Sequence, residues 1–254
     1  MTRVITSLKT WQSLRNTFSH DQIVGFVPTM GNLHRGHESL LQQARTDNAI
    51  SVLSIFVNPT QFNDPNDLAN YPRTFDRDLQ IAKSQKVDYV LLPNNDDLYP
   101  DDYRYQVNET KESLILEGQS RPGHFTGMLT IVLKLLNLVK PHRVYFGEKD
   151  FQQLELVKGM ARALFLDVEI IACPTIREHS GLAMSSRNGR LSETERHLAD
   201  CFAKALKEFT NQENFIAQLD KHGIVVDYIE TWKNRLLAAV QIGKIRLIDN
   251  VKIC

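Results

Sequence analysis

Two hydrophobic patterns alternate along the first two thirds of the chain. Short runs rich in β-branched residues are separated by longer stretches in which apolar residues recur at helical spacing. The short runs predict strands over residues 23–27, 50–57, 87–92, 143–146 and 168–172. The longer stretches predict helices over residues 37–48, 74–85, 124–138 and 151–165. Strands that alternate with helices at this spacing indicate an α/β domain with a parallel sheet, in which ligands bind beyond the carboxyl ends of the strands.

The pattern changes from about Arg177 onward. Ser192-Glu193-Thr194-Glu195 is typical of a capping box and predicts a helix that runs toward Phe209. After it we expect a helix over residues 214–221, a strand in VVDYI, a helix over 234–240 and a strand over 246–248. The sequence therefore predicts two domains, residues 1–176 and a smaller α+β domain over residues 177–254.

Composition narrows the classes of partner. Lys plus Arg (30) equals Asp plus Glu (30), so no global field attracts nucleic acid or an anionic membrane, and any anion site must be local. Cys173, Cys201 and Cys254 match neither a disulfide framework nor a paired zinc motif. The start of the chain lacks an apolar leader, and the most apolar stretch, MLTIVLKLLNLV, is too short to span a bilayer. We expect a soluble, cytoplasmic protein.

The string PTMGNLHRGH directly follows the first predicted strand. Its two glycines allow close backbone approach to a ligand, and His34 and His37 share one face where the next helix begins. A helix N-terminus presents free N–H groups to phosphate. The alternatives are two histidines with no ligand, or a metal site, although no further ligands follow at zinc spacing.

A second anion motif, MSSRN, lies far along the chain. It offers two hydroxyls and the fixed cation of Arg187, which can form a bidentate pair with phosphate; the alternative is a plain surface loop. Together with His-Arg-Gly-His, the motif resembles the HIGH and KMSKS signatures of the nucleotidyltransferase superfamily.

Two further motifs follow strand ends. GEKD places Lys149 as a mobile point charge for phosphate, unless the segment is only a capped helix start with Asp150 as N-cap. FVNPTQF brackets Asn58 and Gln61 with phenylalanines, which suits a small polyol acid, unless it is an ordinary Asn-Pro turn. Asp78 begins a helix, where the helix dipole alone could explain an acid.

Seven strings occur in one order: PTMGNLHRGH, FVNPTQF, YPRT, RPGHF, YFGEKDFQQL, GLAMSSRN and RLIDN. In this order and over nearly the whole chain, they resemble the pantothenate synthetase (pantoate–β-alanine ligase) family. The resemblance implies a Rossmann-like domain with a small C-terminal lid domain, and a homodimer. It also implies that ATP and Mg²⁺ are used to condense pantoate with β-alanine through a pantoyl-adenylate, with release of AMP and pyrophosphate.

The resemblance further implies roles for single residues. His37 would be the proton donor, and His34, Lys149 and Arg187 would stabilise phosphate charge. ATP would be bound by Met30, Gly31, Asn32, Leu33, His34, Arg35, Gly36, His37, Gly147, Glu148, Lys149, Asp150, Ile176, Met184, Ser185, Ser186 and Arg187. Pantoate would be bound by Gln61, Gln153 and Asn58, with Gln61 also bordering β-alanine, and Asp78 would help to hold magnesium.

The chain departs from the family pattern at two places. His179-Ser180 stands where the family commonly has Ala-Asp, and the C-terminal domain is shorter than is common; we expect both to affect lid closure. Two other functions stay open: a plain nucleotidyltransferase that stops after nucleotidyl transfer, and a regulator that senses ATP without turnover. A plain nucleotidyltransferase would not need the amides at 58, 61 and 153, and a sensor would not need Lys149 and the two histidines.

Overall fold

The computed structural model describes residues 1–253, so Cys254 lies outside it. The chain divides into two compact units. The first comprises Met1–Leu33, His37–Gly147 and Gln152–Cys173. The second comprises the chain from Pro174 onward together with two short segments of the N-terminal region, His34–Gly36 and Glu148–Phe151. The boundary that we expect after residue 176 stays a prediction.

The first unit is built on a six-stranded sheet of order β1-β4-β3-β2-β5-β6, in which every pairing is parallel. Its strands are β1 (Arg3–Ile5), β2 (Val24–Thr29), β3 (Ile50–Ile55), β4 (Tyr89–Leu91), β5 (Arg143–Gly147) and β6 (Glu169–Cys173). All five strands predicted in this region are confirmed. Sequence periodicity missed β1, which is only three residues long and has two exposed positions.

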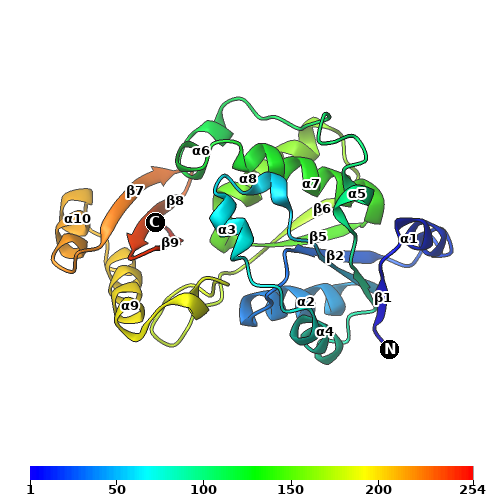
Figure 1. Cartoon of the computed structure of the whole chain (residues 1–254), viewed down its shortest axis with the longest axis horizontal. Helices are drawn as coiled ribbons and strands as arrows, with labels where there is room; N and C mark the ends of the chain where they lie inside the picture. The colour runs from blue at the N-terminus through cyan, green and yellow to red at the C-terminus, as the bar shows by residue number, and fades with distance from the viewer. Residues whose placement is uncertain (254) are drawn as a thin grey trace. The chain divides into compact units, whose positions relative to one another are not determined.

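Helices cover both faces of this sheet. Figure 1 shows α2 and α4 on one face, with α7 and α8 on the other. These four predicted helices are confirmed as α2 (Arg35–Asp47), α4 (Phe75–Ser84), α7 (His124–Val139) and α8 (Phe151–Ala163). Shorter elements complete the unit: α1 (Leu8–Arg15), η1 (Pro59–Gln61), α3 (Pro65–Ala69), α5 (Asn95–Leu98), η2 (Glu112–Leu114) and α6 (Glu117–Ser120).

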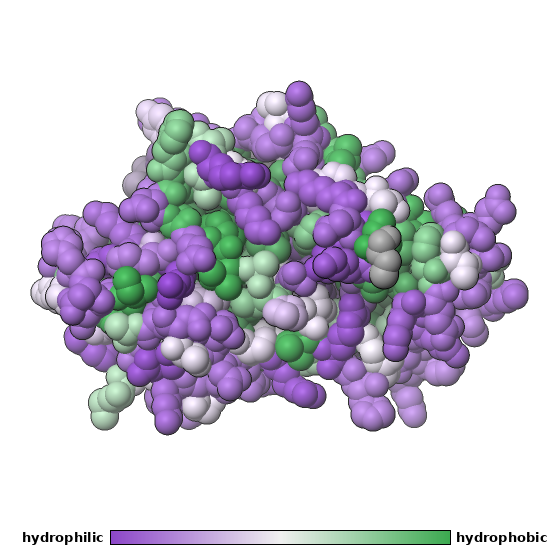
Figure 2. All heavy atoms as spheres, turned by 180° about the vertical axis from the view of Figure 1, so that it is seen from behind, coloured by the Kyte–Doolittle hydropathy of each residue, from purple (hydrophilic) through white to green (hydrophobic). Residues whose placement is uncertain are grey.

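The apolar helix α7 is a core element. Most of its residues are buried, including Leu129, Val132 and Leu136. Within residues 1–253, no helix is both long enough and apolar enough to cross a membrane. On the face shown in Figure 2, hydrophilic side chains predominate and apolar ones form only scattered patches.

The second unit packs two helices against a three-stranded antiparallel sheet of order β7-β8-β9. Its elements are η3 (Glu148–Asp150), η4 (Asn188–Arg190), α9 (Glu193–Lys207), α10 (Gln212–Asp220), β7 (Val225–Trp232), β8 (Arg235–Ile242) and β9 (Ile245–Lys252). The capping box is confirmed: Ser192 accepts from the Glu195 N–H, and the Glu195 carboxylate accepts from the Ser192 N–H. Buried Phe202, Leu206 and Phe215 form the centre of this core.

The helix predicted over residues 234–240 is wrong, because this segment lies in strand β8. Its Leu and Ala residues favour a helix by propensity, but β8 is the central strand and all its residues except Gln241 are buried. Two-residue turns at 233–234 and 243–244 connect it to both neighbours. A central strand buried on both faces shows no alternation, so periodicity cannot distinguish it from a buried helix.

Candidate functional site

Three of the motifs begin where the central strands β2, β3 and β5 end, at the carboxyl edge of the parallel sheet. β2 lies between β3 and β5: the strands that follow β2 directly in the chain, β3 and β4, lie on one side of it, and the later strands, β5 and β6, lie on the other. Such a reversal of strand order is where parallel sheets bind ligands. Met30 follows β2, Asn58 follows β3, and Gly147 ends β5.

The turn after β2 is held by one buried carboxylate. Asp78, from the first turn of α4, accepts the N–H of Asn32 at 2.9 Å and the N–H of Leu33 at 2.7 Å. Gly31 and Asn32 both have positive φ, 79° and 49°. A Cβ on Gly31 would lie 3.0 Å from the Asp78 carboxylate and 3.1 Å from Ile55. The close packing and the positive φ together favour glycine at this position.

This geometry gives Asp78 a different role from the magnesium ligand expected. Its side chain is buried, and both oxygens also lie 3.2 Å from the Thr74 hydroxyl, which donates to them. Across residues 1–253, no group of three or more His, Cys, Asp and Glu side chains could hold a metal ion. Both Asp78 oxygens are therefore already used inside the protein, which does not fit a direct magnesium ligand at this position.

His34 caps the start of α2. The Gly36 N–H donates to His34 Nδ1 at 3.1 Å, so in the neutral ring Nε2 carries the proton and is a donor. A Cβ on Gly36 would lie 2.9 Å from the imidazole, so glycine lets the ring fold over the helix start. His37 follows in the first turn of the helix, half-buried like His34.

The turn after β3 carries a cluster of buried amides. Asn58 Nδ2 donates to Gln61 Oε1 at 3.1 Å and to the Gly127 carbonyl at 3.2 Å, while Tyr99 donates its O–H to Asn58 Oδ1 at 2.7 Å. Burial raises the pKa of Tyr99 to about 12, so the phenol remains a donor at neutral pH. Asn58 is 1% exposed, and its hydrogen bonds orient Gln61.

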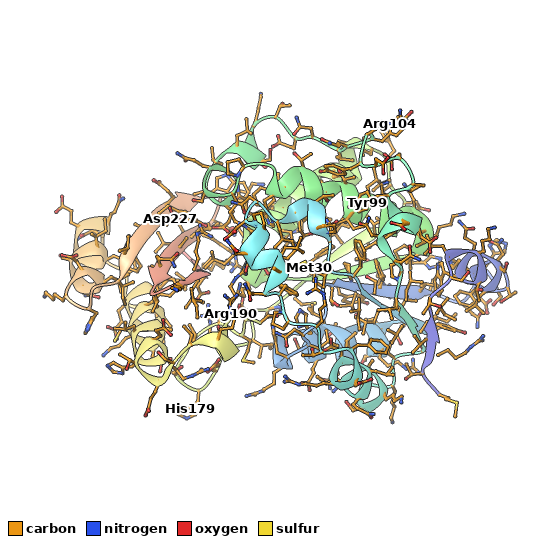
Figure 3. The ribbon with its side chains drawn as sticks, viewed as in Figure 1. Met30, Tyr99, Arg104, His179, Arg190 and Asp227 are labelled. Carbon is orange, nitrogen blue, oxygen red and sulfur yellow. The ribbon has the colours of Figure 1, made fainter. Side chains whose placement is uncertain are left out.

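Gln61 connects two of the strand-end turns. Its Nε2 lies 3.0 Å from the sulfur of Met30, which follows β2 (Figure 3). His124 Nδ1 donates to the Gln61 carbonyl at 2.7 Å, which fixes the backbone of η1 from the start of α7. Sequence reasoning missed Tyr99 and gave His124 no contact beyond its place at the start of a predicted helix, because neither residue has a spacing that would indicate the contact.

The two neighbouring glutamines of α8 have separate roles. Gln152 is buried, donating to the carbonyls of Glu112 and Ile115 at 2.8 Å and accepting from the Glu117 N–H at 3.1 Å. Gln153, the predicted pantoate contact, is half-exposed in the first turn of α8, and its side chain forms no hydrogen bond with residues 1–253. Gln153 therefore keeps its amide available for a ligand.

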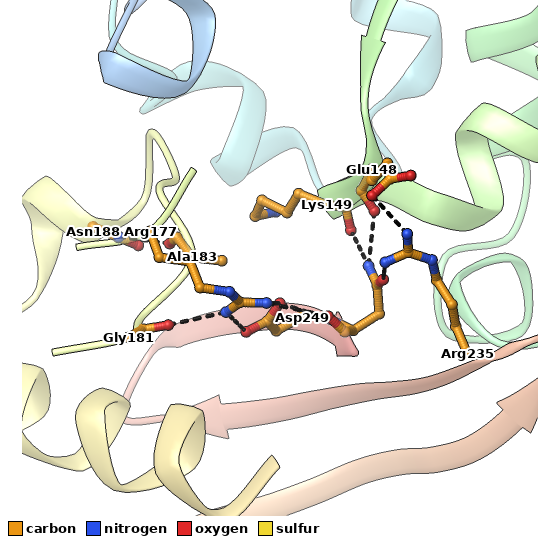
Figure 4. Close-up of polar contacts among 9 residues, drawn as sticks. Glu148, Lys149, Arg177, Gly181, Ala183, Asn188, Arg235 and Asp249 are labelled. Carbon is orange, nitrogen blue, oxygen red and sulfur yellow. Dashed lines mark hydrogen bonds and ion pairs between the residues drawn. The ribbon is translucent and has the colours of Figure 1, made fainter. Parts of the chain in front are cut away.

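In the second unit, strand β9 holds the one-turn segment Glu148–Asp150 (η3), which we call the Lys149 loop. Asn250 Nδ2 donates to the carbonyls of Glu148 and Lys149, at 2.9 and 2.8 Å (Figure 4). Arg235 donates to Asn250 Oδ1 at 2.7 Å and pairs with the Glu148 carboxylate at 2.6 Å. The Lys149 ammonium lies 3.4 Å from the carboxylate of Asp150.

The Met184–Arg187 segment follows a tight hairpin. Met184 donates its N–H to the Ile176 carbonyl at 2.9 Å, and Arg177 pairs with Ala183 across the hairpin. The Arg187 N–H donates to Ser185 Oγ at 3.2 Å, which folds the loop on itself. All four residues from 184 to 187 are half-buried.

The His179-Ser180 departure falls at the exposed tip of this hairpin. The acid that supports the loop is Glu178, which accepts from Asn188 Nδ2 at 2.8 Å and from Arg196 at 2.8 Å. The loop therefore has a carboxylate partner without an acid at position 180.

The predicted site residues are found in both units. The first unit holds Met30, Gly31, Asn32, Leu33, His37, Asn58, Gln61, Gly147 and Gln153. The second holds His34, Arg35, Gly36, Glu148, Lys149, Asp150, Ile176, Met184, Ser185, Ser186 and Arg187.

Comparison with known proteins extends over the whole chain. The family model described as pantoate-beta-alanine ligase matches residues 2–252. The chain is 52% identical over 248 residues to a pantothenate synthetase of Legionella pneumophila (strain Corby), covering 98% of each chain. It is 53% identical over 252 residues to a pantothenate synthetase of Coxiella burnetii (strain RSA 331 / Henzerling II), covering 99% of this chain and 97% of the relative.

A solved structure has the same fold. The pantoate-beta-alanine ligase of Francisella tularensis, crystallised with beta-gamma ATP and beta-alanine, is 44% identical and superimposes with a TM-score of 0.95. The match covers 99% of this chain and 98% of that one. The shorter C-terminal region is therefore shared with these relatives and is no peculiarity of this chain.

Proposed function

Because the chain belongs to the pantoate–β-alanine ligase family, we propose that the residues described above carry out the reaction of that family. The protein condenses pantoate with β-alanine, uses ATP to activate pantoate as an adenylate, and releases AMP and pyrophosphate. The match over residues 2–252 supports this function. The strand-end origin of the motifs supports the assignment of the site.

Adenylation requires an in-line attack of the pantoate carboxylate on the α-phosphorus, with pyrophosphate leaving. The protein contributes positioning and charge stabilisation rather than covalent chemistry. We assign the phosphate oxygens to the His34 Nε2–H, Lys149 and Arg187, with His37 as the proton donor. The rest of ATP would be bound by the backbone of residues 30–37, 147–150, 176 and 184–187.

The binding of the two smaller substrates, pantoate and β-alanine, is assigned to side-chain amides. Gln61 and Gln153 would bind pantoate, and Gln61 would also border β-alanine. Asn58 was expected to bind pantoate, and we now propose that it acts through Gln61, because its own amide already bonds inside the protein. In the second step the β-alanine amine attacks the acyl-adenylate and AMP leaves.

Magnesium, oligomeric state and compartment complete the proposal. Mg²⁺ commonly keeps several waters and binds through substrate phosphates, so we propose that it arrives with the triphosphate. A homodimer and a cytoplasmic location are proposed from the family resemblance and the sparse cysteines. Sedimentation of the purified protein at micromolar concentration tests the dimer: a monomer would contradict it.

The central test removes two side chains that this assignment places at the reacting phosphate, those of His37 and Lys149. His37→Ala and Lys149→Ala should each lower pyrophosphate release at least about 100-fold, because loss of one preorganised electrostatic contact costs about 3–4 kcal/mol of transition-state stabilisation. His222→Ala and Lys244→Ala, at exposed positions, are the matched controls and should leave the rate unchanged. Near-normal pyrophosphate release from either site variant would refute the assignment.

The same assay separates the alternative functions. The ligase releases AMP when ATP, pantoate and β-alanine are all present. Pyrophosphate release that does not depend on pantoate would indicate a plain nucleotidyltransferase. Nucleotide binding without any turnover would indicate a sensor.

A further inference from the structure

The last strand of the second unit, β9, contains two adjacent buried polar residues in its second half. Asp249 and Asn250 are only 3% and 2% exposed, and the buried core of this unit is mostly apolar. Buried polar groups are costly unless they are hydrogen-bonded. Both side chains bond to segments that carry residues of the proposed site.

Asn250 fixes the backbone of the Lys149 loop. Its NH₂ group donates to two successive carbonyls, those of Glu148 and Lys149. The orientation of the amide is determined by Arg235, which donates to Oδ1 and can act only as a donor. Arg235 is itself held by the Glu148 carboxylate and lies 4.8 Å over the ring of Phe151.

Asp249 holds the hairpin that leads to the Met184–Arg187 loop. Its two oxygens accept from the Arg177 guanidinium at 2.6 and 2.9 Å, a bidentate pair (Figure 4). Arg177 also donates to the carbonyls of Gly181 and Asn250 at 2.9 and 3.2 Å. Through Arg177, both arms of the hairpin are therefore joined to β9.

We propose that Asp249 and Asn250 are positioning residues for adenylation, one dipeptide that sets both phosphate-binding segments against a single rigid strand. The inference rests on the proposed function. Neither side chain needs to touch the substrate: Asn250 acts through the backbone of Lys149, and Asp249 through Arg177. Because β9 pairs along its whole length with β8, the two loops share one fixed frame.

Asn250→Asp tests the first contact with little change in shape. The variant keeps an oxygen for Arg235 but replaces the NH₂ group by an oxygen that faces two carbonyl oxygens. The Lys149 loop is then released, and a misplacement of 1 Å can cost about 100-fold in rate. We expect single-turnover pyrophosphate release to fall by between about 10-fold and 100-fold, with the KM for pantoate changed by less than about 3-fold.

A double-mutant cycle distinguishes positioning from general loss of stability. If Asn250 acts through Lys149, adding Asn250→Asp to Lys149→Ala should lower the rate by less than about 2-fold further. Arg246→Ala is the control, since it removes an ion pair with Asp227 elsewhere in the same sheet. It should leave the rate of adenylation unchanged.

Asp249→Asn tests the second contact by the same cycle against Arg187→Ala. Wild-type rates in the folded Asn250 and Asp249 variants, or fully additive losses in both cycles, would overturn the inference. If Asn250→Asp does not fold, Asn250→Ala introduces no charge and takes its place. An inactive wild-type enzyme would instead contradict the proposed function, so the two failures are distinguishable.

Discussion

Asp78→Asn is the sharpest test of how the turn after β2 is built. The carboxylate accepts two backbone N–H groups, at 2.9 and 2.7 Å, one on each oxygen. In the variant, one oxygen becomes an NH₂ group that faces an N–H. One charge-assisted bond is lost, and a buried N–H donor is left without its acceptor.

The magnitude follows from these two changes. A hydrogen bond to a charged group is worth about 1.5–3 kcal/mol, and an unsatisfied buried donor costs about 1–3 kcal/mol. Since the two terms overlap, we expect a net loss of about 3 kcal/mol in the free energy of unfolding. For a protein of this size, that loss lowers the Tm by roughly 6–12 °C.

Thermal unfolding and pyrophosphate release, measured over a magnesium titration, check this prediction. Asp76→Asn is the matched control, because Asp76 lies in the same first helical turn but is exposed. If Asp78 holds the turn after β2, the variant should have a lowered Tm and a loss of adenylation that added Mg²⁺ does not restore. A Tm equal to that of the control, with activity rescued by excess Mg²⁺, would refute it and restore Asp78 as a metal ligand.

Two further predictions concern the amide cluster and the opposite edge of the sheet. Gly127→Ala places a Cβ 2.7 Å from the Gln61 nitrogen and against the Thr60 carbonyl, so α7 and η1 must separate. We expect a loss of about 1–3 kcal/mol in the free energy of unfolding and a raised KM for pantoate. Gly159→Ala is the control: its Cβ meets open space, so it should be neutral or stabilising. An unchanged KM for pantoate in Gly127→Ala would contradict this prediction. His142 Nδ1 accepts the Val24 N–H at 2.9 Å, and burial, followed by repulsion from Arg15, lowers its pKa below 6.5. As the pH falls, the unfolded chain therefore binds the proton before the folded protein does, so the Tm should fall as the pH drops below about 6.5. The variant His142→Asn keeps a hydrogen-bond acceptor but does not titrate. Parallel Tm curves for the two proteins between pH 7.5 and 5 would count against this role of His142.

Local signals in the sequence were sufficient for most elements. The strands from β2 to β6 and the helices α2, α4, α7 and α8 have clear periodicity, and the Ser192 capping box is a contact between residues three apart. β1 was missed because three residues are too few to show a pattern. β8 was misassigned because its neighbours in the sheet, rather than its own composition, decide its conformation.

The candidate site shows the same division. Motif chemistry and strand-end placement indicated the segments that we propose bind phosphate, because these properties are local in the chain. The supporting contacts join residues distant in sequence: Asn32 with Asp78, Asn58 with Tyr99, and Lys149 with Asn250. No spacing rule connects such pairs.

The sequence by itself therefore indicated which residues are candidates for binding ATP and a small acid, and which family the chain resembles. Only the tertiary structure decided which of those residues are left available and which are used to hold others. Asp78 and Asn58 have side chains suited to a metal or a substrate, but burial requires their polar atoms to be hydrogen-bonded, and backbone and side-chain groups of the protein itself fill that requirement. Gln153 remains half-exposed beside the buried Gln152, a distinction made by packing alone.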